Sequence, residues 1–333
     1  MATFGAAVRL WSALVVLSAL VVLASVLVGG EGSTLAGSWR GLMHAADTPM
    51  HSIVHELRIP RALAAYGVGG LLALSGCLMQ VLVRNPLADP YTLGLSGGAA
   101  VGALGAMLAG AGAVATAAGA AIGALFACVA VFVLAHRDLI ARRRGAHRDD
   151  ATDLILIGVM LASGFGAIVS MMLVLAPDRN LRGMLFWMMG DLSGVSTPWP
   201  PLVAMLAGLL PLIPLGRQLN LLARGEESAS ALGVRPQAVK SAIFAIASLA
   251  TAVAVTTAGT VGFVGLVVPH ALRRVVGNDQ RVLIPASALC GGMLVVVADT
   301  ISRIVADPIQ LPVGAVMAII GVPTFLFLLV KRR

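Results

Sequence analysis

Long apolar runs separated by short polar segments make up most of this chain. The run from residue 62 to residue 83 is typical, because it follows the charged sequence R-I-P-R and stops at the polar sequence N-P-L-A-D-P. A helix of about 20 residues, rising about 1.5 Å per residue, spans the roughly 30 Å of hydrocarbon in a bilayer. The runs lack the alternation of a transmembrane barrel strand, so they predict membrane-spanning helices.

The same pattern predicts an all-α polytopic membrane protein, with one transmembrane domain over residues 1–333. We place about ten spans, at residues 10–28, 62–83, 93–109, 114–135, 152–176, 198–216, 238–258, 260–272, 282–300 and 312–330. The first run is longer than the apolar region of a typical signal peptide and no clear A-x-A site follows it, so we count it as a span. The break at residues 257–262 is compatible with a tight re-entrant turn as well as with two separate helices.

Glycines recur at a fixed spacing in two neighbouring spans. Gly94, Gly98 and Gly102 repeat every four residues, and Gly119 and Gly123 repeat the same spacing. This spacing places small residues on one helix face, where two backbones can approach closely. We therefore expect the two helices to pack through glycine, although Gly94 and Gly98 are also compatible with room beside a bulky solute.

Composition and charge agree with this topology. Charged residues make up 11% of the chain, against about a quarter in soluble domains. With the N-terminus in the cytoplasm, all but six of the 23 lysines and arginines fall on the cytoplasmic side, as the positive-inside rule requires. The rule predicts that both termini are cytoplasmic. Because the basic residues are spread over loops, the net charge of +8 reflects topology, and we expect no nucleic-acid partner.

Sequence signals for enzymes and for ATP binding are weak or absent. A phosphate-binding loop needs G-K-[ST], but Lys240 and Lys331 both follow valine. His55 and Glu56 lack the second histidine of H-E-x-x-H, and His270 suits a capping role better than a catalytic one. The three cysteines lie inside apolar runs, where cysteine behaves as a small hydrophobic residue. We expect no catalytic residue, cofactor or metal site.

Ion-coupled transport is a second alternative, since it normally places ionisable residues deep within spans. Most carboxylates here lie near the ends of the predicted spans. Asp299 and Arg303 have the i, i+4 spacing of an ion pair along a helix. A secondary transporter and a membrane enzyme are therefore the weaker hypotheses.

Specific motifs cover nearly the whole chain. They are R-I-P-R (58–61), S-G-x-x-M-Q (75–80), R-N-P-L-A-D-P (84–90), L-G-x-S-x-G-A (93–99), G-E-x-S-A-x-x-L-G-V (225–234), G-x-V-G-F-V-G-L-V-V-P-H (259–270) and L-P-V-G (311–314). Together they resemble the permease family that imports iron chelates, haem and vitamin B12 in bacteria.

The resemblance implies the membrane subunit of a type II ABC importer in the bacterial inner membrane. Such a permease pairs with a second copy of itself, two ATP-binding subunits and a periplasmic substrate-binding protein. Within this family, haem or a ferric siderophore is a more common cargo than cobalamin, so we expect one of the first two.

The resemblance also implies roles for residues at the two ends of the second predicted span. Docking of the binding protein is assigned to Arg58, Arg61 and Arg303. The alternative is that these arginines anchor helix ends at lipid headgroups. The cytoplasmic gate is assigned to Asn85, Leu87, Ala151 and Thr152, although Ala151 lacks the hydroxyl that the family has there.

Loop chemistry fits the first half of this gate. Pro86 and Pro90 stiffen the loop, and a residue that precedes proline avoids helical geometry, so the helix should stop near Asn85. Two copies of Leu87 would then meet on a dimer axis as an apolar plug. Alternatively, Asn85 caps the helix end and Leu87 packs within its own subunit.

Residues 217–237 predict a short helix on the cytoplasmic face. Gly225 interrupts the apolar patch before it, Glu226 and Glu227 suit a helix N-terminus, and Gly233 suits a helix end. By resemblance this segment couples the permease to the ATPase, through Gly225, Glu226, Ala229, Leu232 and Gly233. Without a partner the same segment is an ordinary surface helix.

Overall fold

The computed structural model describes residues 4–29, 33–43, 49–135 and 150–330, and its regular elements are all helices. They are α1 (Phe4–Leu27), α2 (Leu35–Met43), α3 (Pro49–Ser52), η1 (Ile53–Arg58), α4 (Ile59–Leu82), η2 (Pro90–Leu93), α5 (Leu95–Leu108), α6 (Ala113–Leu134), α8 (Asp150–Leu175), α9 (Asp178–Met188), α10 (Trp199–Leu209), α11 (Leu212–Leu222), α12 (Glu226–Ala231), α13 (Pro236–Ala258), α14 (Val264–Val276), α15 (Gln280–Ile304) and α16 (Val313–Val330). The predicted all-α membrane architecture is confirmed.

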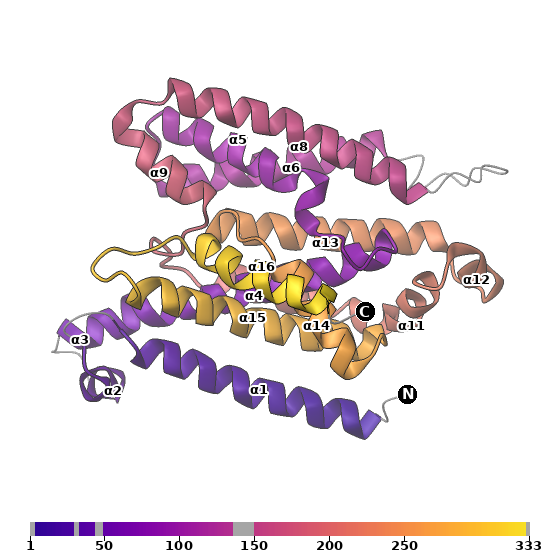
Figure 1. Ribbon diagram of the computed structural model, residues 1–333, viewed down its shortest axis with the longest axis horizontal. Helices are drawn as coiled ribbons and strands as arrows, with labels where there is room; N and C mark the ends of the chain where they lie inside the picture. Colours follow the sequence, from indigo (N-terminus) through magenta and orange to yellow (C-terminus); the bar gives the residue numbers. More distant parts are fainter. Residues whose placement is uncertain (1–3, 30–32, 44–48, 136–149, 331–333) are drawn as a thin grey trace.

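The helices form a layered bundle around α4. Helices α13, α14 and α15 pack directly on α4, while α1 lies along α15 on one side of the bundle. Helices α5, α6, α8 and α9 form a further layer beyond α13 (Figure 1). Short helices α2 and α3 lie at one end, and α12 lies at the other end together with the first turn of α1 and the last turn of α16.

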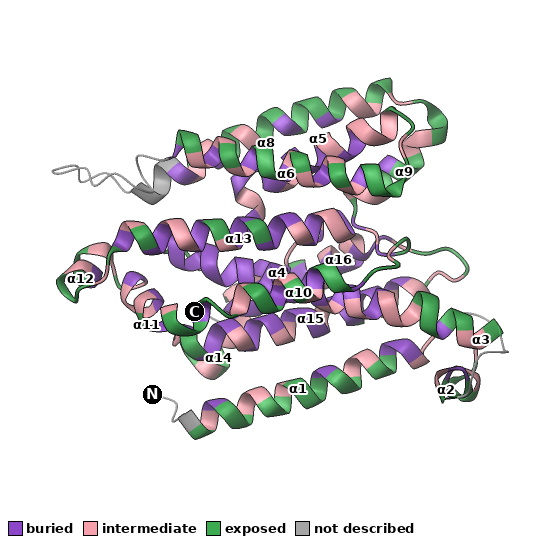
Figure 2. Ribbon diagram, turned by 180° about the vertical axis from the view of Figure 1, so that it is seen from behind, coloured by how far each residue is buried: buried purple, intermediate pink, exposed green. Residues whose placement is uncertain are grey.

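Helix α4 is the buried core of the bundle. Pro60 occupies its first turn, directly after the π-helical segment η1, and nearly every residue from Ala62 to Leu82 is buried. A helix that is apolar on all faces must be covered on all faces. Figure 2 shows this contrast, with α4, α13 and α15 largely buried and α1 and α8 largely exposed.

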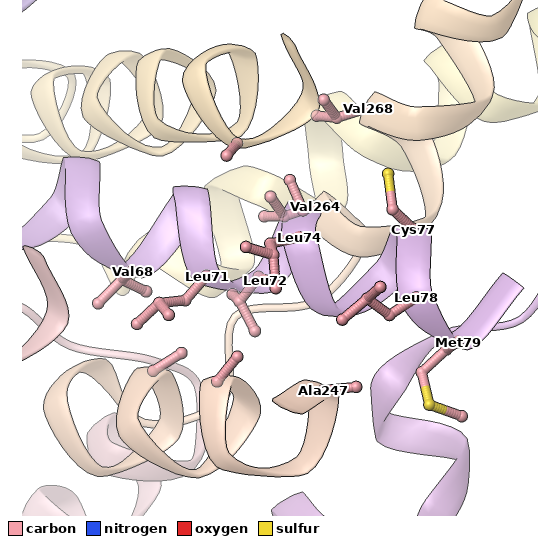
Figure 3. Packing of buried hydrophobic residues seen from close by; sticks show 14 of the residues in the cluster. Val68, Leu71, Leu72, Leu74, Cys77, Leu78, Met79, Ala247, Val264 and Val268 are labelled. Atoms are coloured by element: carbon pink, nitrogen blue, oxygen red, sulfur yellow. The ribbon is translucent and has the colours of Figure 1, made fainter. Parts of the chain in front are cut away.

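Small residues bring the neighbours of α4 unusually close. A Cβ atom on Gly76 would lie 2.0 Å from the carbonyl oxygen of Gly265 in α14, and one on Gly69 would lie 2.2 Å from that of Gly291 in α15. Larger side chains fill the space between these contacts. Figure 3 shows buried side chains of α4, with Ala247 of α13 and Val264 of α14 on different sides of that helix. Only glycine fits where the backbones touch, so these positions fix the helix spacing.

The glycine stripe predicted for residues 98–123 is confirmed. A Cβ atom on Gly102 would lie 2.0 Å from the carbonyl oxygen of Gly119, and one on Gly123 would lie 2.0 Å from that of Gly98. Gly94 does not belong to this stripe. It precedes α5 with φ +77°, a left-handed conformation that favours glycine, and it faces α8.

The predicted count of ten spans is approximate. In the described residues, seven helices are long and apolar enough to cross a membrane, or eight if a bent pair counts as one span. That pair is α10 and α11, so the span expected at residues 198–216 corresponds to two helices joined by a bend. The two helices meet at 60°, next to Pro211, whose ring disrupts helical hydrogen bonding. The spans expected at 93–109 and 260–272 correspond to the shorter helices α5 and α14.

The turn between α13 and α14 lies inside the bundle. Gly259 and Phe263 both have positive φ, +66° and +68°, and Gly265 in the first turn of α14 then lies against Gly76 of α4. The hydroxyl of Tyr91 bridges this turn, because it donates to the Val261 carbonyl at 3.2 Å and accepts from the Val261 amide at 3.1 Å. The irregular backbone is thus satisfied by protein groups, as a membrane protein requires.

Candidate functional site

A buried ion cluster joins α4 to α15 near one end of the bundle. The carboxylate of Asp299 is fully buried and lies 2.8 Å from the guanidinium of Arg61 and 3.2 Å from that of Arg303. Arg61 also donates a 2.7 Å hydrogen bond to Gln310. The expected pair of Asp299 and Arg303 is therefore present. Arg61 and Gln310 were missed as its partners because they are far away in sequence.

The three arginines assigned to docking lie at this same end. Arg58 donates to the Val26 carbonyl at 3.2 Å and to the Ser38 hydroxyl at 2.9 Å. Arg303 donates to the Ser25 hydroxyl at 2.9 Å. Arg61 is only 8% exposed, whereas Arg58 and Arg303 are partly exposed. The structure thus brings Arg61 and Arg303 together around Asp299, and leaves Arg58 on a separate contact with α2. Docking by these arginines stays a prediction.

The loop assigned to the gate begins where α4 ends. The helix stops at Leu82, and Arg84 takes a left-handed conformation with φ +53°. The side chain of Asn85 then accepts a 2.9 Å hydrogen bond from the amide of Leu87, which closes a turn. The predicted helix stop before Pro86 is confirmed. Leu87 is 45% exposed, so neighbours in its own chain cover only part of it.

The second half of the expected gate is described only by its backbone. Ala151 and Thr152 lie in the first turn of α8, and their side chains fall outside the described residues. A role for them, like that of Asn85 and Leu87, stays a prediction.

Asp89 stabilises the same loop after Leu87. Its carboxylate accepts a 2.8 Å hydrogen bond from the amide of Tyr91, and its carbonyl accepts one of 2.6 Å from the hydroxyl of Thr92. Burial raises the pKa of Asp89 to about 6, while the bond from Tyr91 opposes this shift. The loop is therefore held by its own side chains on both sides of Pro90.

The short helix expected after residue 225 is α12. Gly225 precedes it with φ +122° and Gly233 follows it with φ +81°, both conformations that favour glycine. Glu226 in its first turn lies 3.0 Å from the ammonium group of Lys240 in α13. Ala229 is fully buried within the chain, whereas Leu232 is 61% exposed. A partner would therefore meet Leu232, while Ala229 holds α12 in place.

A cavity of about 420 Å³ lies beside α12, between α11 and α13. Arg217 and Arg235 contribute positive charge to its wall, and Leu221 and Leu232 contribute apolar surface. An acidic or apolar side chain of a partner fits this combination. The sequence had predicted an apolar patch here without indicating a cavity.

The structure places three features that bear on the enzyme alternative. The string G-L-S-G-G at residues 94–98 has the spacing of a nucleophile elbow, but it forms the N-cap and first turn of α5 and follows the short helix η2, whereas the elbow requires a preceding strand. The described residues contain no group of three or more histidine, cysteine or carboxylate side chains placed to hold a metal. His270 packs its ring against that of Phe325, with centroids 5.7 Å apart.

Known proteins resemble this chain over nearly its full length. A cobalamin import system permease of Halobacterium salinarum is 42% identical over 286 residues, which cover 84% of this chain and 74% of that protein. A hemin transport system permease of Yersinia pestis is 35% identical over 323 residues, which cover 94% of this chain and 95% of that protein.

Solved structures and family membership agree. A structure described as an inward-facing conformation of a metal-chelate type ABC transporter has a TM-score of 0.83 at 28% identity, covering 97% of this chain and 99% of that chain. The FecCD transport family matches residues 16–331. These matches confirm the resemblance drawn from the motifs, and the chain belongs to the FecCD transport family.

Proposed function

We propose that this chain is the permease subunit of a binding-protein-dependent ABC importer that moves a metal chelate into the bacterial cytoplasm. The observation that supports this most is the placement of candidate sites at the two ends of α4. Arg61 lies in its first turn, and the loop with Leu87 follows its last turn. In the proposed orientation, Arg61 is periplasmic, and the Leu87 loop and α12 are cytoplasmic.

Energy enters through α12 in this proposal. ATP hydrolysis in a separate subunit would move α12, and the ion pair of Glu226 with Lys240 would pass that movement to α13. Helix α13 is in turn tied to α4, since the Ser75 hydroxyl donates to the Ala247 carbonyl at 2.9 Å and lies 2.7 Å from the Thr251 hydroxyl. In this proposal, the ion pair, helix α13, the Ser75 contacts and helix α4 together connect α12 to the Leu87 loop.

The importer works as a dimer of this chain in our proposal. Two copies of Leu87, each 45% exposed in the single chain, would close the path on the dimer axis. Exposed apolar side chains on α8, such as Met160 at 61% and Met171 at 66%, would then be covered by the second copy or by lipid.

The cargo is a metal chelate such as haem or a ferric siderophore, with cobalamin as the alternative. Relatives named for hemin and for cobalamin both match this chain closely, so their names favour neither. All three molecules are large and metal-centred. No side chain described above distinguishes between them.

An ion-coupled transporter is the weaker alternative. Asp299, the fully buried carboxylate in α15, is held in ion pairs with Arg61 and Arg303, which join α4 to α15 as a structural cluster does. A proton relay needs a carboxylate that gains and loses a proton during transport.

Ligand-stimulated ATP hydrolysis tests this proposal. The permease is reconstituted with its ATPase and binding protein, and haem, a ferric siderophore and cobalamin are added separately. We expect one of the three to raise the rate of ATP hydrolysis. The proposal fails if the permease forms no complex with an ATPase, and the cargo class fails if none of the three ligands has an effect.

A further inference from the structure

Two histidine rings face each other at the periplasmic end of the proposed topology. His51 is the third residue of α3 and His55 lies in η1, and their ring centroids are 4.2 Å apart with 31° between the ring planes. The spacing of four residues brings side chains to the same helix face. The π-helical segment Ile53–Arg58 is the local structure that carries His55. Such segments are rare in proteins, but those that occur often lie at functional sites.

Each ring uses one nitrogen to hold the end of α2. Nδ1 of His51 lies 3.0 Å from the Gly41 carbonyl oxygen, and Nε2 of His55 lies 3.4 Å from that of Leu42. A carbonyl oxygen only accepts, so the nitrogen that faces it must carry the hydrogen. In the neutral ring, the other nitrogen then keeps its lone pair. These are Nε2 of His51 and Nδ1 of His55.

This arrangement matches the outer contacts of metal-binding histidines. A histidine that binds a metal nearly always donates its second nitrogen to a carbonyl or carboxylate, which fixes the tautomer and the ring orientation. Both rings here have that contact. The carbonyl end of α2 also carries partial negative charge, which favours a cation nearby.

We propose that His51 and His55 form a binding site for one divalent transition metal ion of the kind that prefers imidazole, such as Zn²⁺ or Cu²⁺. Two nitrogens that bind one Zn²⁺ at about 2.0–2.1 Å lie at most about 4 Å apart. The ring centroids are 4.2 Å apart with 31° between the planes, so both rings must turn toward a shared ion for their free nitrogens to bind it. No third protein ligand joins them in the described residues, so water or an exogenous ligand fills the other positions.

The site lies where a metal ion can reach it. His55 is exposed and His51 is half-buried. A bound ion would link η1 to the end of α2, whose Gly41 already packs against the backbone of Met50. The proposal does not depend on the cargo or on the ATPase.

Two substitutions separate metal binding from a purely structural role. In His51→Asn the amide nitrogen replaces Nδ1 as donor to Gly41, and in His55→Gln it replaces Nε2 as donor to Leu42. Both variants keep the hydrogen bonds to α2 but remove the free ring nitrogen. Ser52→Ala, an exposed position between the two histidines, is the matched control.

The test is calorimetric titration of Zn²⁺ into the full-length protein in detergent, purified through a tag without histidine. We expect the wild-type protein to bind one more Zn²⁺ per chain than the double variant. Each single variant should bind that ion more than about tenfold more weakly, because loss of even an outer contact lowers metal affinity about 10–100-fold. The Ser52→Ala protein should bind like wild type. The double variant keeps the other histidines of the chain, so its Zn²⁺ binding measures their contribution, which is subtracted from that of the wild type.

Stability measurements complete the test. Zn²⁺ should raise the melting temperature of the wild-type protein and leave that of the double variant unchanged. In the wild-type protein, bound Cu²⁺ should show coupling to two imidazole nitrogens by electron paramagnetic resonance. Equal Zn²⁺ binding by wild type and double variant, or no saturable binding by wild type, would overturn the site and leave the two histidines as caps of α2 only.

Discussion

The guanidinium of Arg61 in α4 lies 2.8 Å from the carboxylate of Asp299 in α15, although 238 positions separate the two residues in the sequence. Both side chains are buried, so each charge depends on the other to offset the cost of leaving water. Arg303 lies against the second carboxylate oxygen at 3.2 Å. One acidic group thus holds two of the three arginines assigned to docking.

Replacing Asp299 by asparagine should destabilise the protein by about 3–5 kcal/mol, because it leaves the buried charge of Arg61 without a partner. Unfolding of the purified protein in detergent measures the change. Glu56→Gln, an exposed position at the same end of the bundle, should change stability by less than about 0.5 kcal/mol. Similar small effects for both variants would show that the cluster does not stabilise the fold.

Arg58 is the best position at which to test docking. Its substitution leaves the Asp299 cluster intact, whereas a change at Arg61 or Arg303 would also disturb the fold. Arg58→Glu should weaken binding-protein affinity by at least about tenfold, since one bond to a charged group contributes about 1.5–3 kcal/mol. The remaining affinity should also depend less on salt.

Surface-immobilised binding protein and detergent-purified permease suffice for that affinity measurement. Arg40→Glu is the control, since Arg40 is exposed on α2 at the same end of the bundle. If the Arg58→Glu and Arg40→Glu variants both bind the binding protein as tightly as the wild type does, Arg58 anchors the helix at the membrane surface instead.

Leu232 and Ala229 should separate coupling from folding. Leu232→Glu should leave the melting temperature unchanged but abolish co-purification of the ATPase, because Leu232 is 61% exposed beside the cavity at α12. Ala229→Trp should instead displace α12 from its own chain, since Ala229 has no exposed surface. Leu57→Glu, also 60% exposed but at the opposite end, should keep the ATPase bound. Retention of the ATPase by Leu232→Glu would place the coupling surface elsewhere.

Leu87→Ala should leave assembly intact and make the closed complex leak a small solute from liposomes without ATP, because it removes most of the proposed plug. Leu206→Ala, 58% exposed in α10, is the matched substitution outside the path and should stay tight.

Cysteine cross-linking tests the same plug directly. Cysteines placed at position 87, in a background without the native Cys77, Cys128 and Cys290, should cross-link two copies in a nucleotide-dependent way. A tight Leu87→Ala complex together with no cross-link in any nucleotide state would exclude this gate.

Local sequence rules predicted the features of this fold that depend on near neighbours. Glycine spacing predicted the contact of α5 with α6, and the glycines at 225 and 233 predicted both ends of α12. The bend between α10 and α11 was missed, although Pro211 signals it, because hydropathy alone shows one continuous apolar run.

Contacts between distant segments were beyond sequence reasoning. The pairing of Asp299 with Arg303 was readable from the i, i+4 spacing, but Arg61 and Gln310 reach the same carboxylate only through the packing of α4 on α15. Likewise, the H-x-x-x-H spacing of His51 and His55 is visible in the sequence, whereas the carbonyl groups that orient both rings belong to α2.

Uptake into proteoliposomes is the most direct test of the proposed importer. The permease and its ATPase are reconstituted together, and the binding protein with its labelled chelate is added on the periplasmic side. We predict accumulation that requires ATP on the side of α12 and the binding protein on the opposite side, and that persists when ionophores collapse all ion gradients. The account would be contradicted if the permease alone, without ATPase or ATP, accumulated the chelate when an ion gradient was imposed.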